Sequence, residues 1–473
     1  MSGAPDHWNQ HAPQEPALDL RSNLAGCAWP AIPSSRGALL QAMLFQFAAS
    51  ERWSADEILA HQLEQLQGLL RHAYESVEWY RRRLHEAGYR PGERLTLAGW
   101  RALPLLSRRD VQGAAGALAS RALPPAFGGT TAVQTSGSTG EPVKVLVTAV
   151  DQLLWDAITL REHAWHRRDL TARLASIRVF LKGGGEPPHG TRADNWGGPA
   201  AELYATGPMA LLSLTTDVAV QARWLQQQNP EYLLTYPTNL AALMAHFAAR
   251  RERLGRLRAV RTVGETVTPQ LRAACREAWG VPLVDLYSSQ EAGYLALQCP
   301  QAEHYHVMAE SVLVEILDAN GAPCAPGETG RIVVTKLHSF AMPLIRYEIG
   351  DYAQAGPPCP CGRGLPTIAR ILGRSRNMLS LPGSERHWPV VGFSEFRAIA
   401  PVRQYQLVQH TLQDIEVRFA VERTISADEE ERLARVIRAA LGHPFRLRFT
   451  YFDDAIPRGP GGKFEEFVSR LAA

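Results

Sequence analysis

The sequence contains little lysine, few cysteines and no long hydrophobic run. Four of its 50 basic residues are lysine, and the others are arginine. No segment approaches the ~18 consecutive apolar residues of a membrane-spanning helix. The first residues are polar and proline-rich, without the basic and then apolar pattern of a secretion signal. Six cysteines in 473 residues are too few for a disulfide scaffold. These absences predict a cytoplasmic protein without a membrane anchor.

A large excess of charge of either sign is absent as well. The chain has 50 Lys and Arg against 47 Asp and Glu, a net charge of +3, which does not favour a nucleic-acid partner. Hydrophobic residues make up 45% of the chain, enough for a large core, which excludes a disordered or fibrous protein. A length of 473 residues allows about two to four domains.

Most of the chain has the pattern of an α/β domain. Residues 1–35 lack periodicity and predict a loose arm, either wrapped on the surface or disordered. Residues 38–87 have helical spacing of apolar residues, and Ser107 is a candidate N-cap of a further helix. After Gly128, short β-rich runs alternate with helical ones, which predicts a largely parallel sheet. Two antiparallel strands should follow Glu310.

The C-terminal part is patterned differently. Two strand-like runs, a helix at about 427–441 and a third strand-like run form a small α+β unit. Ser426 and Glu429 have the spacing of a capping box at the start of that helix. We therefore predict an arm at 1–35, a large domain at 36–374 with mixed and parallel sheets, and a small lid domain at 375–473.

The strongest local signal is TSGSTGEPVK, residues 135–144, directly after the strand-like TTAVQ. Glycines allow a close wrap of backbone N–H and hydroxyl groups around phosphate oxygens, and Lys144 adds positive charge. The segment is not a Walker motif, because it lacks GK[ST]. On its own it is equally consistent with a flexible surface turn.

Other chemistry-bearing residues follow in order. Glu291 comes after the apolar run LVDLY, near the sheet edge where open α/β sheets bind ligands. Asp351 follows a glycine in PLIRYEIGD, which suits the two hydroxyls of a ribose. Arg374 lies in GRS at the expected domain boundary, and Lys463 lies in the glycine-rich PRGPGGK.

This ordered set resembles the adenylate-forming superfamily, and more narrowly its phenylacetate–CoA ligase branch. The matching motifs are the glycine- and hydroxyl-rich loop, Y-x-x-x-E at 287–291, P-L-x-R-Y-x-x-G-D at 343–351, GRS at 373–375 and the late lysine. The resemblance covers about residues 60–470. It implies an ATP-dependent ligase that forms an acyl-adenylate from a small apolar or aromatic acid and passes the acyl group to coenzyme A.

The resemblance also implies roles for individual residues. The loop, with Lys144, would hold the β- and γ-phosphates of ATP; its residues are Ser136, Gly137, Ser138, Thr139 and Gly140. Tyr287 and the turn Val263-Gly264-Glu265 would frame the adenine and the acyl pocket, and Ser288 would also bind the nucleotide. Asp351 would bind the ribose, assisted by Arg374. Glu291 would help bind Mg²⁺, and Tyr236 and Pro237 would line the acid pocket. Lys463 would bridge the attacking carboxylate and the α-phosphate.

A second constellation is independent of the first. Cys299, His306, Cys359 and Cys361 supply three thiolates and one imidazole, the ligand set of a closed structural zinc site. His304 is a rival ligand, two residues away. The alternative is a group of reduced thiols that pack without metal.

The chain departs from the branch in three places. Gln290 replaces a hydroxyl residue ahead of Glu291, and Arg376 and Asn377 replace two aspartates after GRS, where the small domain would turn. These departures bear on the second half-reaction more than on the first. The acceptor could instead be an amine or a carrier-protein thiol, and a non-catalytic nucleotide-binding relative is the alternative outside the enzymes. The sequence leaves open whether the protein is a monomer or a homodimer.

Overall fold

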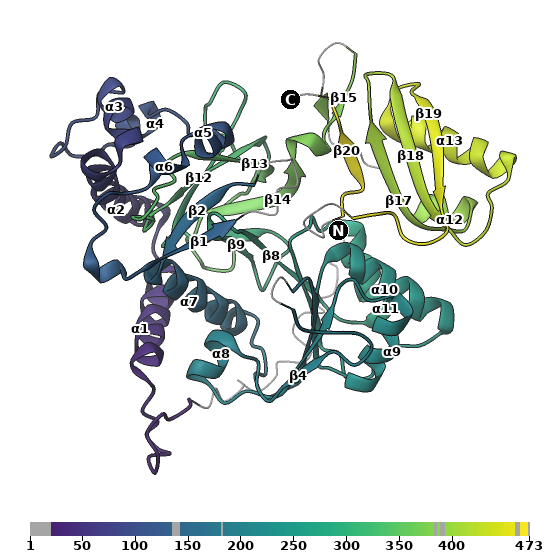
Figure 1. The fold of residues 1–473 in the computed structure, drawn as a ribbon, viewed down its shortest axis with the longest axis horizontal. Coiled ribbons are helices and arrows are strands. Elements are labelled where there is room, and N and C mark those ends of the chain that lie inside the picture. The colour runs from purple at the N-terminus through teal and green to yellow at the C-terminus, as the bar shows by residue number, and fades with distance from the viewer. Residues whose placement is uncertain are drawn as a thin grey trace, which may run out of the picture.

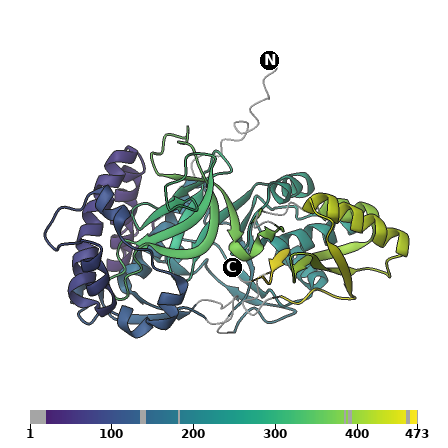
Figure 2. The same ribbon diagram turned by 90° about the horizontal axis from the view of Figure 1, so that it is seen from above.

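The computed structural model describes residues 20–134, 142–180, 183–382, 386–387, 393–458 and 464–471. It comprises a large N-terminal domain built on a twelve-stranded sheet and a small C-terminal domain built on a four-stranded sheet (Figure 1). Seen from above, the N-terminal helices and the C-terminal domain lie at opposite ends of the molecule (Figure 2).

The first elements along the chain are helices, which pack on one end of the large sheet. Their bounds are α1 Ser35–Ser50, α2 Ala55–Ser76, α3 Glu78–Glu86, α4 Leu97–Ala102, α5 Arg108–Gly113, α6 Ala115–Leu118 and the 3-10 turn η1 Pro125–Phe127. Leu66, Leu69 and Leu70 of α2 are fully buried, as the helical spacing requires. Ser54 and Glu57 form a capping box, which explains why the helical region breaks before α2. Ser107 caps α5, as predicted.

The expected arm is described from Leu20 onward. Leu20 forms a bridge with Tyr204, and Arg21 N donates to the carbonyl of Leu203. Ser34 then caps α1, and its hydroxyl also contacts Glu202. Residues 20–34 therefore lie along the surface of the large domain.

The strands β1 Thr130–Gln134 and β2 Lys144–Thr148 form a separate antiparallel pair, in which Gln134 is opposite Lys144. The glycine- and hydroxyl-rich segment therefore connects two antiparallel strands, and a helix begins only after β2, as α7 Ala149–Trp165. Residues 135–141 themselves lie outside the described part of the chain.

The twelve-stranded sheet has the order β11-β12-β13-β14-β10-β9-β8-β7-β6-β3-β5-β4. Its parallel section consists of β3 Leu174–Arg178, β5 Met209–Ser213, β6 Tyr232–Thr235, β7 Ala259–Val263 and β8 Leu283–Ser289. Helices connect these strands, as the sequence predicts; their bounds are α8 Gly198–Leu203, α9 Val218–Gln228, α10 Pro237–Arg250 and α11 Pro269–Trp279. The edge strand β4 Thr191–Ala193 is antiparallel.

The other half of the sheet is antiparallel, so the expectation of a largely parallel sheet is only half correct. Its strands are β9 Gly293–Gln298, β10 Tyr305–Val307, β11 Val312–Leu317, β12 Thr329–Lys336, β13 Tyr347–Ala355 and β14 Thr367–Arg374. Loops without helices join these strands, and neighbouring strands are antiparallel; β11 lies at the edge of the sheet, and β14 returns beside β10. The antiparallel pair expected after Glu310 is β11 and β12.

Two hydrophobic layers cover the faces of this sheet. Helix α7 packs on one face with the N-terminal helices, through buried residues such as Ile158. Helices α9, α10 and α11 pack on the other face, where Leu225, Leu243 and Cys275 are fully buried (Figure 1). Both faces of the parallel section are therefore covered, which is typical of parallel sheets.

After β14 the chain passes through η2 Ser375–Asn377 and the short strands β15 Leu379–Ser380 and β16 Arg386–His387. The C-terminal sheet has the order β19-β18-β17-β20. Its elements are α12 Phe393–Ile399, β17 Val402–Gln409, β18 Asp414–Val421, α13 Ala427–Leu441, β19 Arg446–Phe452 and β20 Phe467–Ser469. The capping box of Ser426 and Glu429 is present, as predicted.

Among the described residues, the structure has no helix that is both long and apolar enough to cross a membrane.

Candidate functional site

Asp351 and Arg374 face each other across neighbouring strands. They are register partners in the antiparallel pair β13–β14, and Arg374 Nε lies 3.4 Å from Asp351 Oδ1. Tyr287, near the end of β8, donates its hydroxyl to Asp351 Oδ2 at 2.7 Å. Gly350 has a φ of +86°, which side-chain-bearing residues rarely adopt, and this conformation turns the strand just before Asp351. The structure therefore brings these three side chains together, and their roles at a nucleotide stay predictions.

Glu291 lies in the turn between β8 and β9 and is buried. Its Oε1 atom has no hydrogen-bond partner within the described part of the chain. Burial lowers the pKa of Arg374, but the carboxylates of Asp351 and Glu291 raise it by more, so this pKa is raised overall. Burial and the neighbouring Asp351 raise the pKa of Tyr287 well above its usual value, so its hydroxyl stays a donor. A buried carboxylate oxygen without a partner suits a divalent cation with oxygen ligands.

Several residues that we predict to bind the nucleotide or the carboxylic acid lie at the carboxyl ends of neighbouring parallel strands. Tyr236 directly follows β6, Gly264 directly follows β7, and Ser288 lies near the end of β8. Gly264 has a φ of +83°, and Pro237 is the first residue of α10. Because β6, β7 and β8 are adjacent, these residues occupy neighbouring positions at one edge, where open α/β sheets bind ligands.

Glu265 bridges the two domains. Its Oε2 accepts hydrogen bonds from the backbone N and the hydroxyl of Thr238, at 3.0 and 2.7 Å. Its Oε1 accepts from the backbone N of Phe464 at 2.8 Å and from Arg458 Nη1 at 3.3 Å, both in the C-terminal domain. The Glu265 side chain is 4% exposed. That Glu265 frames the adenine and the acyl pocket stays a prediction.

Arg178, which the sequence reasoning did not single out, ends β3 beside Tyr236. Its Nε donates to Ser176 at 3.0 Å, and its guanidinium lies 5.8 Å from the centre of the Phe180 ring. Burial lowers its pKa, and within the described residues no carboxylate is paired with it. The phenol of Tyr294 acts electrostatically on Arg178, and the ring centre of Tyr294 lies 4.2 Å from that of Trp155 at an interplanar angle of 33°. Trp155 is 36% exposed. Arginine is too common in this chain for its sequence alone to have marked this position.

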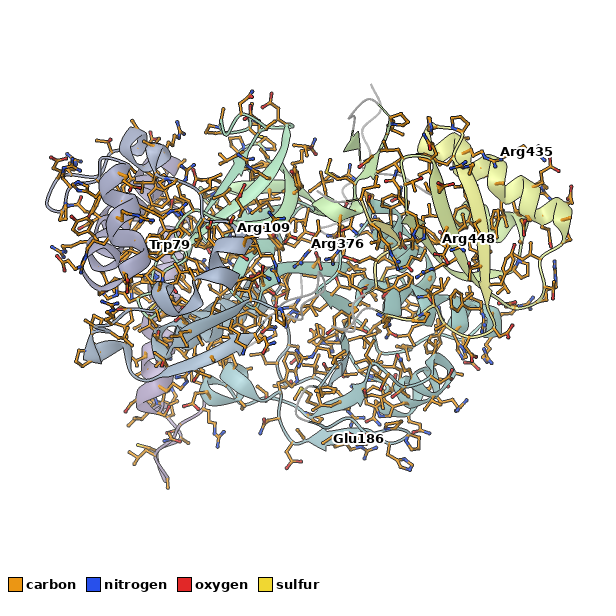
Figure 3. The ribbon with its side chains drawn as sticks, turned by 45° about the horizontal axis from the view of Figure 1, so that its top comes forward. Trp79, Arg109, Glu186, Arg376, Arg435 and Arg448 are labelled. Carbon is orange, nitrogen blue, oxygen red and sulfur yellow. The ribbon has the colours of Figure 1, made fainter. Side chains whose placement is uncertain are left out.

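The two substituted hinge positions make contacts with the lid. Arg376 pairs with Glu465 at 2.6 Å, and Figure 3 shows Arg376 between the two domains. Asn377 accepts a hydrogen bond from Arg374 N at 3.0 Å and donates one to the carbonyl of Phe467 at 2.6 Å. The pair of Arg376 and Glu465 therefore lies at the point after GRS where we predict that the small domain turns.

Some predicted residues have other surroundings or cannot be placed. Lys144 begins β2. Ser136, Gly137, Ser138, Thr139, Gly140 and Lys463 lie outside the described residues.

Arg346 of the PLIRYEIGD run is buried with a φ of +48°; it pairs with Glu315 and donates to the carbonyls of Arg101 and Leu103. Its role is to join β13 to the N-terminal helices.

Cys299, His306, Cys359 and Cys361 come together. Their ligand atoms all lie within 4.8 Å of one another. The sulfurs of Cys299 and Cys359 are 3.8 Å apart, and Cys361 Sγ is 3.4 Å from His306 Nε2. Zn–S bonds of about 2.3 Å in a tetrahedral site place neighbouring sulfurs about 3.8 Å apart, so the donor set fits zinc. His306 Nδ1 faces the carbonyl of Leu365, which turns Nε2 toward the thiols.

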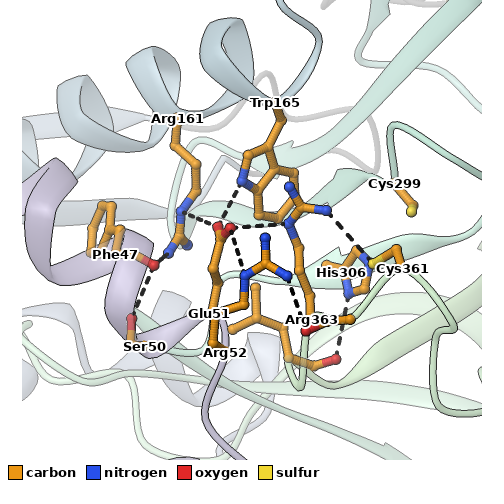
Figure 4. Close-up of polar contacts among 12 residues, drawn as sticks. Phe47, Ser50, Glu51, Arg52, Arg161, Trp165, Cys299, His306, Cys361 and Arg363 are labelled. Atoms are coloured by element: carbon orange, nitrogen blue, oxygen red, sulfur yellow. Dashed lines mark hydrogen bonds and ion pairs between the residues drawn. The ribbon is translucent and has the colours of Figure 1, made fainter.

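A network of charges connects this cluster to α1 (Figure 4). Arg363, two residues after Cys361, lies 3.4 Å from Glu51 and 4.4 Å from the centre of the Trp165 ring. Glu51, which follows α1, accepts a hydrogen bond from Trp165 Nε1 at 2.8 Å. Arg161 of α7 completes the network by pairing with Glu310 at 2.7 Å.

Comparisons with known proteins agree with this arrangement. Residues 200–341 match the family described as AMP-binding enzyme. The chain is 27% identical over 348 residues to a phenylacetate-coenzyme A ligase of Aromatoleum evansii, covering 70% of this chain and 74% of that protein. It is 26% identical over 445 residues to a phenylacetate-coenzyme A ligase of Thermus thermophilus, covering 87% of this chain and 96% of that protein.

Solved structures share the fold. A 2-hydroxyisobutyryl-CoA ligase in a postadenylation state superposes with a TM-score of 0.70 at 18% identity, covering 89% of this chain and 91% of that one. The same ligase in a thioesterification state superposes with a TM-score of 0.59 at 20% identity, over the same shares of the chains. The chain is therefore similar to AMP-binding enzymes and to phenylacetate-coenzyme A ligases, and it shares the fold of the 2-hydroxyisobutyryl-CoA ligase.

Proposed function

We propose that this protein is an ATP-dependent acid–thiol ligase. It activates a carboxylic acid as an acyl-adenylate, with release of pyrophosphate, and then transfers the acyl group to coenzyme A. The single observation that carries this proposal is the convergence of Tyr287, Glu291, Asp351 and Arg374 at one place between β8, β13 and β14. The similarity to phenylacetate-coenzyme A ligases supports the same chemistry.

Asp351 binds the ribose hydroxyls in this proposal. Tyr287 and Arg374 already hold its carboxylate in one orientation, so little conformational entropy is lost when a ribose binds. Glu291, with its unpartnered oxygen, would hold Mg²⁺, which when bound neutralises phosphate charge. Gly264 and Ser288 border the same edge and contact the nucleotide.

Ser136–Gly140 and Lys144 hold the terminal phosphates, and Lys463 stabilises charge at the α-phosphate while the carboxylate attacks. The support for Lys463 is its position in the chain, because the next residue, Phe464, binds Glu265 at the end of β7. The support for the loop is that it joins β1 and β2, whose second strand leads into α7.

The acid binds beside Tyr236 and Pro237. Arg178 and the aromatic pair of Trp155 and Tyr294 are the further side chains that we assign to this region. An aromatic surface next to a guanidinium without a carboxylate partner favours a planar acid that carries a second hydrogen-bond acceptor. This extends the expectation of a small aromatic or apolar acid.

Coenzyme A is the acceptor that the relatives' names support. The substituted hinge, with Arg376 paired to Glu465, leaves an amine or a carrier-protein thiol as the alternative acceptor. Measuring which acceptor accelerates AMP release would show which compound receives the acyl group in the second half-reaction.

The four-residue Cys/His cluster holds a structural zinc ion in this proposal. The observed spacing of the sulfurs, the orientation of His306 and the complete set of four ligands support a closed site without a catalytic position. His304, the rival ligand, has a buried Nε2 without a hydrogen-bond partner among the described residues and is not part of the cluster.

We place the protein in the cytoplasm, where its six unpaired cysteines stay reduced.

The test is an ATP–pyrophosphate exchange screen over carboxylic acids, with benzoate-type and phenylacetate-type acids bearing or lacking a second polar substituent. Acid-dependent exchange supports adenylate formation, and faster AMP release on addition of coenzyme A supports the thiol acceptor. ATP binding without exchange for any acid would instead indicate a non-catalytic relative.

A further inference from the structure

Glu265 links the two domains by hydrogen bonds outside the hinge. One oxygen of its carboxylate binds the start of α10 through Thr238, and the other binds the C-terminal domain through Arg458 and the backbone of Phe464. Hydrogen bonds to a charged acceptor in a site shielded from water are among the strong ones in proteins. The contact is therefore specific to one orientation of the C-terminal domain.

The two lid residues that Glu265 binds stand on either side of Lys463 in the sequence. Phe464 is the next residue after Lys463, and Arg458 is five positions before it. Phe464 and Ile456 are both buried against Ala420 of β18, so this part of the lid is fixed to its own domain. Glu265 therefore holds Arg458 and Phe464 at the end of β7, at the edge of the sheet where Gly264 and Tyr236 lie.

We propose that Glu265 is a positioning residue that fixes the C-terminal domain against the end of β7, in the lid orientation used for adenylate formation, and that it must release the lid before acyl transfer. This inference rests on the proposed function for the chemistry that Lys463 performs. Glu265 thus favours the first half-reaction over the second, by stabilising one of the two lid orientations. In this proposal Glu265 acts through the lid, by its contacts to Arg458 and Phe464, rather than by touching the nucleotide.

The activity test separates the two half-reactions. In Glu265→Ala, acid-dependent ATP–pyrophosphate exchange should fall by about tenfold or more, the usual scale for losing a charge-assisted contact. Thioester formation from supplied acyl-adenylate and coenzyme A should be unchanged or faster. An equal loss in both half-reactions, or weaker binding of the acyl-adenylate, would show that Glu265 contacts the nucleotide and would overturn the proposal.

Thr238→Val is the matched control. It removes the hydroxyl contact to Glu265 on the α10 side and leaves the carboxylate facing Arg458 and Phe464. In this variant the ratio of the exchange rate to the rate of thioester formation should stay at its wild-type value. If it shifts the balance as Glu265→Ala does, the effect comes from the start of α10 and the proposal fails.

A second readout does not depend on activity. Trypsin cleaves after Arg458 and Lys463, and both sites should be cut faster in Glu265→Ala than in the wild type without substrates, whereas cleavage elsewhere stays the same. Unchanged cleavage at both sites would show that Glu265 does not hold the lid, and the proposal would fail. If the wild type shows no exchange with any acid, the proposed function fails, and this measurement still decides whether Glu265 holds the lid.

Discussion

The hydroxyl of Tyr287 lies 2.7 Å from Oδ2 of Asp351, although the two residues are 64 positions apart in the chain. Tyr287 comes from the parallel section of the sheet, and Asp351 comes from the antiparallel section. Their hydrogen bond therefore joins the two halves at the nucleotide site. Arg374 holds the other oxygen of Asp351, so the carboxylate is oriented before any ligand binds.

Asp351→Asn should raise the KM for ATP by about 10- to 100-fold, because hydrogen bonds to a charged acceptor are worth roughly 1.5–3 kcal/mol. The KM for the acid should change little. Steady-state pyrophosphate release measures both constants. Tyr287→Phe is the control, since it removes the orienting hydroxyl and leaves the charge, and it should have the smaller effect. Equal KM values in the wild type and Asp351→Asn would exclude a ribose contact.

Lys463→Ala should lose adenylate formation while it still binds ATP, because an ammonium stabilises charge that develops as pyrophosphate leaves. Pyrophosphate release and ATP titration calorimetry measure the two properties. Lys336→Ala is not a suitable control, because Lys336 pairs with Asp151 in the interior at 2.7 Å. Arg435→Ala is suitable, since Arg435 is exposed on α13. Unchanged pyrophosphate release in Lys463→Ala would refute the role.

Arg376→Asp should weaken adenylate formation, because it places an acid beside Glu465 in the lid. Combining it with Glu465→Arg reverses the pair and should restore most of the exchange rate. A double variant no better than the single one would mean that the pair does not set the lid orientation.

Cys361→Ser should lose the zinc ion and lower the melting temperature by several degrees, since the bound metal stabilises the folded form. Elemental analysis and thermal unfolding measure both effects. Cys324→Ser is the matched control, because Cys324 is outside the cluster. Wild-type protein that contains no zinc when purified under reducing conditions would contradict the assignment.

Glu416 makes the stability of the C-terminal domain depend on pH. Burial raises its pKa, but hydrogen bonds from Arg418, His410 and Thr450 outweigh burial and lower the pKa to about 2. A lowered carboxyl pKa stabilises the fold above the unfolded-state value of about 4.5, and this contribution is lost as the pH falls toward about 2. The difference in urea midpoint between the wild type and Glu416→Gln should therefore shrink over that interval. A constant difference would refute the linkage.

The sequence predicted the elements whose signals are local. Helical periodicity and the pairs Ser54–Glu57 and Ser426–Glu429 mark helix starts, and alternation of strands with helices marks the parallel section. The convergence of Tyr287, Glu291, Asp351 and Arg374 followed from motifs in a known order. The Cys/His cluster was predicted in full, because few cysteines occur in this chain and their spacing is informative.

The contacts between distant segments could not be predicted. Nothing near Glu265 in the sequence indicates that Phe464 and Arg458 bind it, because this depends on how the lid packs on β7. Arg178 is one arginine among many, and only the strand register places it beside Tyr236. The Arg376–Glu465 pair likewise depends on the path of the chain around the hinge.

The network around Glu51 limits how far this protein can be shortened. If α1 were removed, the Trp165 indole would lose its acceptor, and Arg161 and Arg363 would keep their positive charges in the interior without Glu51. A shortened form should therefore begin before Ser34, the residue that caps α1. The opening helix acts as a support for the Cys/His loop, even though it lies far from the nucleotide site.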